Sequence, residues 1–286
     1  MKVRFWGTRG SIPVSITAPG IRAKLAEALA ASRGRDLSTP AAIDIFIDGL
    51  DFSLRGSYGG HSSCVAVLTG SGEHVILDMG SGARPLAQDL LTRFGADQPQ
   101  TYHVFMSHLH WDHTLGFPFF TPVFIPGNRI VIHSCHGDVE YAFRRQQAAP
   151  SFPVDFGQLG AEIVFDVLQP GKRYEVAGLK VSALRQRHAG DSYGWRFEGE
   201  DKVLVYSTDS EHRLENPGEQ ARFVAFFHDA DLVIFDAMYS LLDAISIRAD
   251  WGHSSNAVGV ELRMCCTRRA AWKRSRAAHA VQVDSA

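Results

Sequence analysis

The stretch Ser-His-Leu-His-Trp-Asp-His at 107–113 carries three histidines and an aspartate, directly after a short apolar run that is typical of a β-strand. If the chain stays extended past that strand, His108, His110 and Asp112 point to one side. A following turn brings His113 to the same side. Imidazoles and carboxylates bind Zn²⁺, Mn²⁺ and iron, and four of them can hardly all reach one tetrahedral ion. The pattern therefore predicts a pair of metal ions that share a bridging group.

Polar residues also end four other apolar runs of the chain. These are Asp78 after HVIL, His188 after VSALRQR, Asp209 after KVLVYST and Asp236 after DLVIF. Strand ends are where rigid scaffolds present catalytic and binding groups. An aspartate after a strand is also a common turn former, so each one alone fits a structural role as well. Together with the histidine cluster they favour one site that several strand ends build.

The elements that must position these groups are short strands with a few helices between them. Nine brief runs rich in Val, Ile, Phe and Leu, most of them bounded by Gly, Asn, Asp or Pro, predict strands. Helical patterns lie at 21–33, 84–95, 138–148 and 219–228. Because several strands follow one another directly, strict βα alternation is excluded. The chain is expected to form an α+β domain in which sheets pack together with helices outside.

The composition is that of a globular protein of the size of an enzyme. Of 286 residues, 45% are hydrophobic and 21% are charged, with 29 Lys and Arg against 31 Asp and Glu. The formal net charge of −2 gives no overall attraction for nucleic acid. No window reaches the roughly 18 apolar residues of a membrane span, and we expect a cytoplasmic protein that does not bind membranes. Cys64, Cys135, Cys265 and Cys266 lack zinc-knuckle spacing and are expected to be reduced thiols.

The spacing of the histidine cluster resembles the H-x-H-x-D-H signature of the metallo-β-lactamase-fold hydrolases. The resemblance covers roughly residues 1–257 and is closest to the phosphodiesterase branch, which includes ribonuclease Z and class II-type cyclic-nucleotide phosphodiesterases. It implies an αββα sandwich of two mixed β-sheets flanked by helices, with the metals at one sheet edge. The further motifs that carry it are FWGTRGSIP at 5–13, GGHSSC at 59–64, LDMGSG at 77–82, YSTD at 206–209 and WGHSS at 251–255.

The same resemblance implies two divalent metal ions, with Zn²⁺ as the first expectation and Mn²⁺ or Fe as alternatives. His108 and His110 would bind the first ion together with His188. Asp209 would bridge both ions, because each oxygen of a carboxylate can take one metal. Antibiotic-hydrolysing relatives commonly carry a cysteine at the position of Asp209, so the aspartate favours a two-metal hydrolase.

Asp112 and His113 would bind the second ion, and the catalytic residues implied are Asp112 and His253. Two metals about 3.5–4 Å apart lower the pKa of a shared water, so that a metal-bridging hydroxide attacks phosphorus in line. Asp112 would orient this hydroxide or take its proton. His253 would stabilise the substrate phosphate or protonate the leaving oxygen.

The pattern of the family fails at the C-terminus. Relatives complete the second metal site with a histidine in an apolar-His-His-Asp-Pro stretch, whereas residues 263–286 are rich in Arg, Ala and Cys. We therefore expect a hydrolase domain at 1–262, a poorly ordered tail at 263–286 and a weaker second metal site. The favoured explanation is a shifted reading frame. His279 as a replacement ligand, a tail that binds nucleic acid and a frayed end remain alternatives.

The expected function is hydrolysis of a phosphodiester, either a cyclic nucleotide or an RNA end. Alternatives are a lactone or thioester hydrolase of the same fold, and a non-catalytic metal-binding protein with an incomplete second site. No Gly/Pro/Lys-rich arm like that of ribonuclease Z lies between 150 and 180, which favours a small substrate. The insertion at 17–55 has two open uses, a lid or an oligomer contact, and the second would make the protein a homodimer.

Overall fold

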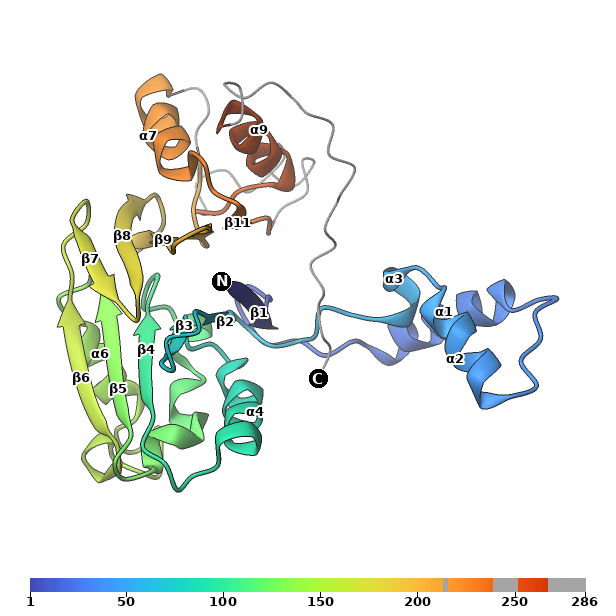
Figure 1. Cartoon of the computed structure of the whole chain (residues 1–286), viewed down its shortest axis with the longest axis horizontal. Helices are drawn as coiled ribbons and strands as arrows, with labels where there is room; N and C mark the ends of the chain where they lie inside the picture. Colours follow the sequence, from blue (N-terminus) through green and yellow to red (C-terminus); the bar gives the residue numbers. More distant parts are fainter. Residues whose placement is uncertain (213–215, 239–251, 267–286) are drawn as a thin grey trace.

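Two β-sheets pack face to face in the computed structural model, which describes residues 1–212, 216–238 and 252–266 (Figure 1). The first sheet has the order β1 (Lys2–Gly7), β2 (Cys64–Leu68), β3 (His74–Leu77), β4 (Thr101–Phe105), β5 (Arg129–Ser134), β6 (Glu162–Val167). The second has the order β11 (Leu232–Phe235), β10 (Val203–Ser207), β9 (Ser192–Glu198), β8 (Leu179–Gln186), β7 (Arg173–Val176). Helices cover the outer faces, so the predicted α+β class and αββα sandwich are confirmed.

Strand direction explains why the polar residues that follow the strands meet. In the first sheet β3, β4, β5 and β6 run parallel to one another, so their carboxyl ends lie at one edge. In the second sheet β9 is antiparallel to both β8 and β10, and β10 is parallel to β11. The carboxyl ends of β8, β10 and β11 therefore also share an edge, and both edges face the same end of the sandwich.

A core of buried aromatic and aliphatic side chains fills the space between the two sheets. Trp195 of β9 is fully buried there, and its ring meets Phe105 of β4 edge to face with centroids 5.1 Å apart. Its Nε1 donates a hydrogen bond of 3.0 Å to the carbonyl of Met106. Since Met106 lies two residues before His108, this bond joins the second sheet to the chain that enters the histidine cluster.

The outer layers hold helices with one apolar face each. The helix α4 (Ala83–Phe94) buries Leu86 and Leu90 against the first sheet and ends at Gly95, whose φ of 72° is the left-handed conformation common after helices. The helix α7 begins after Asn216, whose side chain accepts hydrogen bonds from the next turn. This helix α7 spans Pro217–Phe227. The other helices of these layers are α5 (Trp111–Thr114), α6 (Val139–Gln146) and α9 (Asn256–Cys266), with 3₁₀ turns at Phe117–Phe119, Thr121–Phe124 and Phe156–Gln158. None of the described helices is long and apolar enough to cross a membrane.

The structure differs from the sequence prediction at several boundaries and elements. The strands β6 and β7 lie outside the predicted runs, because both are edge strands without a long apolar run. In β7 exposed and half-buried residues alternate, whereas β6 has a half-buried middle between exposed ends. The helix predicted at 21–33 starts earlier, at Ala18, after the capping residue Thr17. Together with α2 (Pro40–Asp48) and α3 (Phe52–Arg55), this helix α1 (Ala18–Ala31) projects away from the sandwich as an arm (Figure 1).

The C-terminal boundary is described only in part. The helix α9 continues to Cys266, so the backbone of the first four residues of the expected tail is helical. The rest of that tail, including His279, lies outside the described residues. The prediction of a domain at 1–262 followed by a poorly ordered tail therefore stays a prediction.

The contact of Trp195 with Met106 predicts a graded loss of stability. Replacing Trp195 by alanine should lower the free energy of unfolding by about 3–5 kcal/mol, because it leaves a cavity between the sheets. Trp195→Phe keeps most of the packing but leaves the Met106 carbonyl without its donor, which should cost about 1–3 kcal/mol. Urea unfolding followed by circular dichroism measures both values. Equal losses in the two variants would contradict this division between packing and hydrogen bonding.

Candidate metal centre

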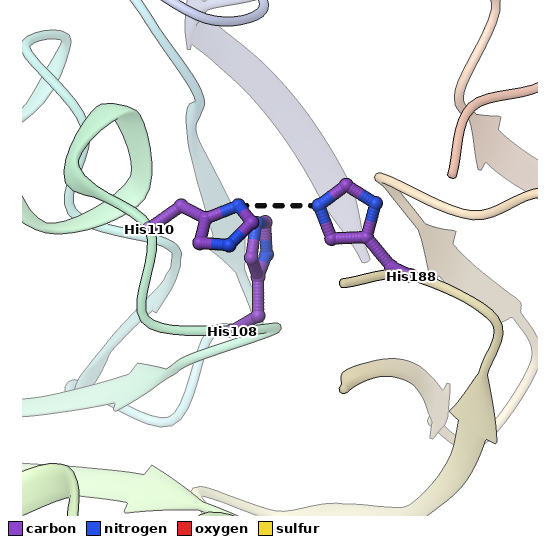
Figure 2. Close-up of side chains that lie close together, drawn as sticks. All are labelled: His108, His110 and His188. Carbon is purple, nitrogen blue, oxygen red and sulfur yellow. Dashed lines mark hydrogen bonds between the residues drawn. The ribbon is translucent and has the colours of Figure 1, made fainter. Parts of the chain in front are cut away.

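Three histidines from two strand ends converge at the edge of the sandwich. His108 and His110 follow β4, and His188 follows β8 in the other sheet. Figure 2 shows their rings gathered around one point, with His110 Nδ1 and His188 Nε2 3.2 Å apart. One nitrogen of each histidine lies within 4.8 Å of the other two. The structure thus brings together the three residues expected at the first metal ion, in a group that can hold a cation.

Asp209 lies between this group and the histidine of the short helix α5. Its Oδ2 is 3.7 Å from His108 Nε2 and 3.8 Å from His188 Nε2, whereas its Oδ1 is 3.4 Å from His113 Nε2. The two oxygens of one carboxylate therefore face two different sets of histidines. This is the arrangement that a bridging ligand requires.

Asp112 and His113 make the second side of the centre. Asp112 Oδ2 is 3.4 Å from His113 Nε2, and it accepts a hydrogen bond of 2.9 Å from the backbone N–H of Ser11. With Asp209, the described residues therefore offer three side chains on this side. The sequence predicts that the tail either lacks a fourth ligand for this side or supplies a replacement such as His279. His279 and the rest of the tail beyond Cys266 lie outside the described residues.

Unpartnered nitrogens show that the cluster fits a metal. Nε2 of His108 and Nε2 of His113 are buried, and neither has a hydrogen-bond partner among the residues that the structure describes. Leaving two such atoms unpaired costs free energy that a bound cation would recover. Burial, helped by the neighbouring His113, lowers the pKa of His108 well below its usual value, so this imidazole is neutral and able to bind a metal.

The buried carboxylates on the second side also favour a bound cation. Burial opposes protonation of His113, but the carboxylates of Asp209 and Asp78 outweigh it and raise its pKa well above the usual value. The pKa of Asp209 is lowered well below its usual value, because His113 and His108 outweigh the effect of burial. Buried carboxylates around His113 therefore attract one positive charge, which is either a proton or a metal ion.

Asp78, at the end of β3, holds the second side in place. Its carboxylate accepts hydrogen bonds of 2.7 Å from His113 Nδ1, from the hydroxyl of Tyr206, and from both the N–H and the hydroxyl of Ser107. The side chain is fully buried. Because His113 donates through Nδ1, its Nε2 is left to face Asp112 and Asp209. Asp78 thus accepts a hydrogen bond from a histidine of the cluster and fixes the orientation of its ring.

The segment 252–255 supports His188 and positions His253. His188 Nδ1 donates a hydrogen bond of 2.8 Å to the carbonyl of Gly252, which leaves Nε2 for the centre. Gly252 has a φ of 78°, and a Cβ there would lie 2.5 Å from His188 Nδ1, so only glycine allows this approach. His253 Nδ1 donates a hydrogen bond of 2.8 Å to Asp236 Oδ2. Burial opposes protonation of His253, but Asp236 outweighs it and raises the pKa.

A cavity of about 280 Å³ opens beside the centre, and His113, Asp209 and His253 line it. Two other lining residues, Asp236 and Arg9, were given no firm role by the sequence. Asp236 is one of the residues that the sequence placed at a strand end, whereas Arg9 stands in the motif FWGTRGSIP and is brought to the centre only by the fold. Arg9 follows β1, is exposed, and has no ion-pair partner among the residues that the structure describes.

Comparison with known proteins shows the family and the fold of the chain. A family model described as "Beta-lactamase superfamily domain" matches residues 74–271. Ribonuclease Z of Haloarcula marismortui is 27% identical over 137 residues, which are 46% of this chain and only 40% of that protein. Human tRNase Z, short form, superposes with a TM-score of 0.58 at 18% identity, over 93% of this chain and 89% of its own. A diphosphatase from the PhnP family has a TM-score of 0.50 at 18% identity, over 76% of this chain and 74% of its own. The two solved structures share the fold.

The hydrogen bonds of Asp78 predict a selective effect on metal binding. Asp78→Asn should weaken zinc binding by about 10–100-fold, because the amide no longer fixes His113 in its tautomer. Zinc titration against a fluorescent chelator measures the change. Tyr206→Phe is the matched control, since it removes one hydrogen bond from Asp78 and leaves His113 untouched. Equal weakening in both variants would show that Asp78 acts through the sheet contact and not through His113.

Proposed function

The chain belongs to the β-lactamase superfamily, and we propose that it is a metal-dependent hydrolase that cleaves a phosphodiester. The observation that carries the proposal is the position of Asp209, with one oxygen toward His108 and His188 and the other toward His113. A carboxylate so placed suits a two-metal centre. Two-metal centres are common in enzymes that cleave phosphate esters.

The residues of the centre would hold the ions as two sets that share Asp209. His108, His110 and His188 form the first set, and the donor chemistry of three imidazoles and a carboxylate suits Zn²⁺. Bound divalent ions would supply positive charge for a phosphoryl group and lower the pKa of a water molecule. The second set has only Asp112, His113 and the shared Asp209 among the described residues, and we propose that it binds its ion less tightly.

The chain's own groups supply the proton transfers. Asp112 is held by the N–H of Ser11, so its carboxylate keeps a fixed direction and can orient a water or accept its proton. His253 is held by Asp236 through Nδ1, and its raised pKa favours the protonated form that can donate to a leaving oxygen.

Charge and size support a small anionic substrate. The cavity of about 280 Å³ is close to the lower limit of small-molecule sites, about 300 Å³. Arg9 and His253 add positive charge to its lining. A phosphodiester carries a negative charge that both can contact, whereas a lactone or thioester is neutral. A cyclic nucleotide or the end of an RNA chain meets these requirements, and a ribonuclease Z and a tRNase Z are among the similar proteins.

Removing the bridging carboxylate tests the proposal directly. Asp209→Ala should lower the rate of bis(p-nitrophenyl) phosphate cleavage at least about 100-fold, since metal centres contribute several kcal/mol to such reactions. It should also lower the zinc content, measured by inductively coupled plasma mass spectrometry. The exposed Asp201→Ala is the matched control and should change neither quantity. A wild-type protein that binds one ion or none and shows no turnover would support a non-catalytic metal-binding protein instead.

A substitution at Arg9 tests whether the site prefers charged phosphodiesters to neutral esters. Arg9→Gln should lower kcat/KM for bis(p-nitrophenyl) phosphate by about 10–100-fold, as expected for loss of a charge-assisted hydrogen bond. It should leave kcat/KM for p-nitrophenyl acetate nearly unchanged. Arg222→Gln, on the exposed side of α7, controls for a general loss of positive charge. An equal decrease for both substrates would mean that Arg9 acts through the fold and not through the phosphate.

A further inference from the structure

The arm, which we define as residues 15–59, exposes much apolar surface. Its helices α1, α2 and α3 contain no buried residue, and it projects from the sandwich (Figure 1). At the base of the arm the two ends of the segment are joined, because the N–H of Val14 donates a hydrogen bond to the carbonyl of Gly60. Of the 18 exposed large hydrophobic side chains in the described parts of the chain, eight lie in this arm: Ile16, Ile21, Leu25, Leu29, Ile43, Ile45, Ile47 and Tyr58.

These side chains are arranged as faces on two helices. Ile21, Leu25 and Leu29 follow one another at intervals of four along α1, with 45%, 59% and 70% of their surfaces exposed. Ile43 and Ile47 repeat the interval on α2. Helices this short obtain most of their stability from packing an apolar face. Exposed apolar faces of this kind mark a place of association.

The charges of the arm are divided between its two halves. Residues 18–35 carry four basic residues and one acidic residue, whereas residues 36–51 carry four acidic residues and no basic residue. Arg22 and Arg33 on the first part and Asp44 and Asp48 on the second are exposed, and none forms an ion pair within the described chain. The arm as a whole is neutral, with five basic and five acidic residues.

A neutral surface with one basic and one acidic half is complementary to itself. In a two-fold interface the same patch occurs on both copies, so α1 of one copy meets α2 of the other and opposite charges face each other. We propose that the arms of two chains pair about a two-fold axis and make the protein a homodimer, with the apolar faces of α1 and α2 at its centre. The arm offers no net charge to attract RNA or an anionic membrane. This proposal does not depend on the proposed function.

Charge reversal in the full-length protein tests the pairing. The variant Arg22→Glu/Arg33→Glu gives residues 18–35 more acidic than basic residues, and the variant Asp44→Arg/Asp48→Arg leaves α2 with two basic residues and no acidic one. Each alone should dissociate at least about tenfold more readily than the wild type, because like charges then face each other across the interface. An equimolar mixture should form a heterodimer, because each reversed half meets its complement. Sedimentation velocity at low salt gives the species, and native mass spectrometry identifies the heterodimer.

A variant outside the arm and a measurement of helix content control for effects unrelated to pairing of the arms. Arg222→Glu, outside the arm, should leave the dimer intact, and far-ultraviolet circular dichroism should show unchanged helix content in every variant. A monomeric wild type would overturn the proposal, whether or not the arm then binds RNA or lipid vesicles. A dimer that the arm variants do not weaken, or a mixture that fails to form heterodimers, would overturn it equally.

Discussion

The buried carboxylate of Asp78 is the interaction on which the centre depends. A charge in that position is tolerated only because four hydrogen-bond donors surround it. Those donors come from the end of β4, from α5 and from β10, so one side chain joins both sheets to His113. Because the ends of β3 and β4 are fixed against the second sheet in this way, His113 can lie close to Asp209, which follows β10.

The two sides of the centre differ in how they are supported. Three histidines and Asp209 surround the first side, and the carbonyl of Gly252 orients His188 through a hydrogen bond to Nδ1. The second has Asp112 and His113 with the shared Asp209, and it is here that carboxylates concentrate negative charge. The same end of the sandwich also carries the pair of Asp236 and His253. The centre thus combines a well-supported cation site with a side suited to moving protons.

Much of this arrangement could be predicted from the sequence, because the informative signals are local. The spacing of His108, His110 and His113 is visible within six residues, and Asp209 ends an unmistakable strand. Contacts between distant segments could not be predicted. Asp236 pairs with His253 across 17 residues of chain, and Arg9 reaches the cavity from the first strand. Likewise, the insertion at 17–55 suggests helices, but its projection away from the sheets follows only from the packing of the rest.

The most direct test of the account is the position of metal in the crystal. Anomalous diffraction at the zinc edge, from crystals grown with zinc, should show two peaks about 3.5–4 Å apart with the carboxylate of Asp209 between them. The stronger should lie about 2.0–2.1 Å from nitrogens of His108, His110 and His188. No peak at this edge of the sandwich, or zinc bound only at surface histidines such as His228, would contradict the account.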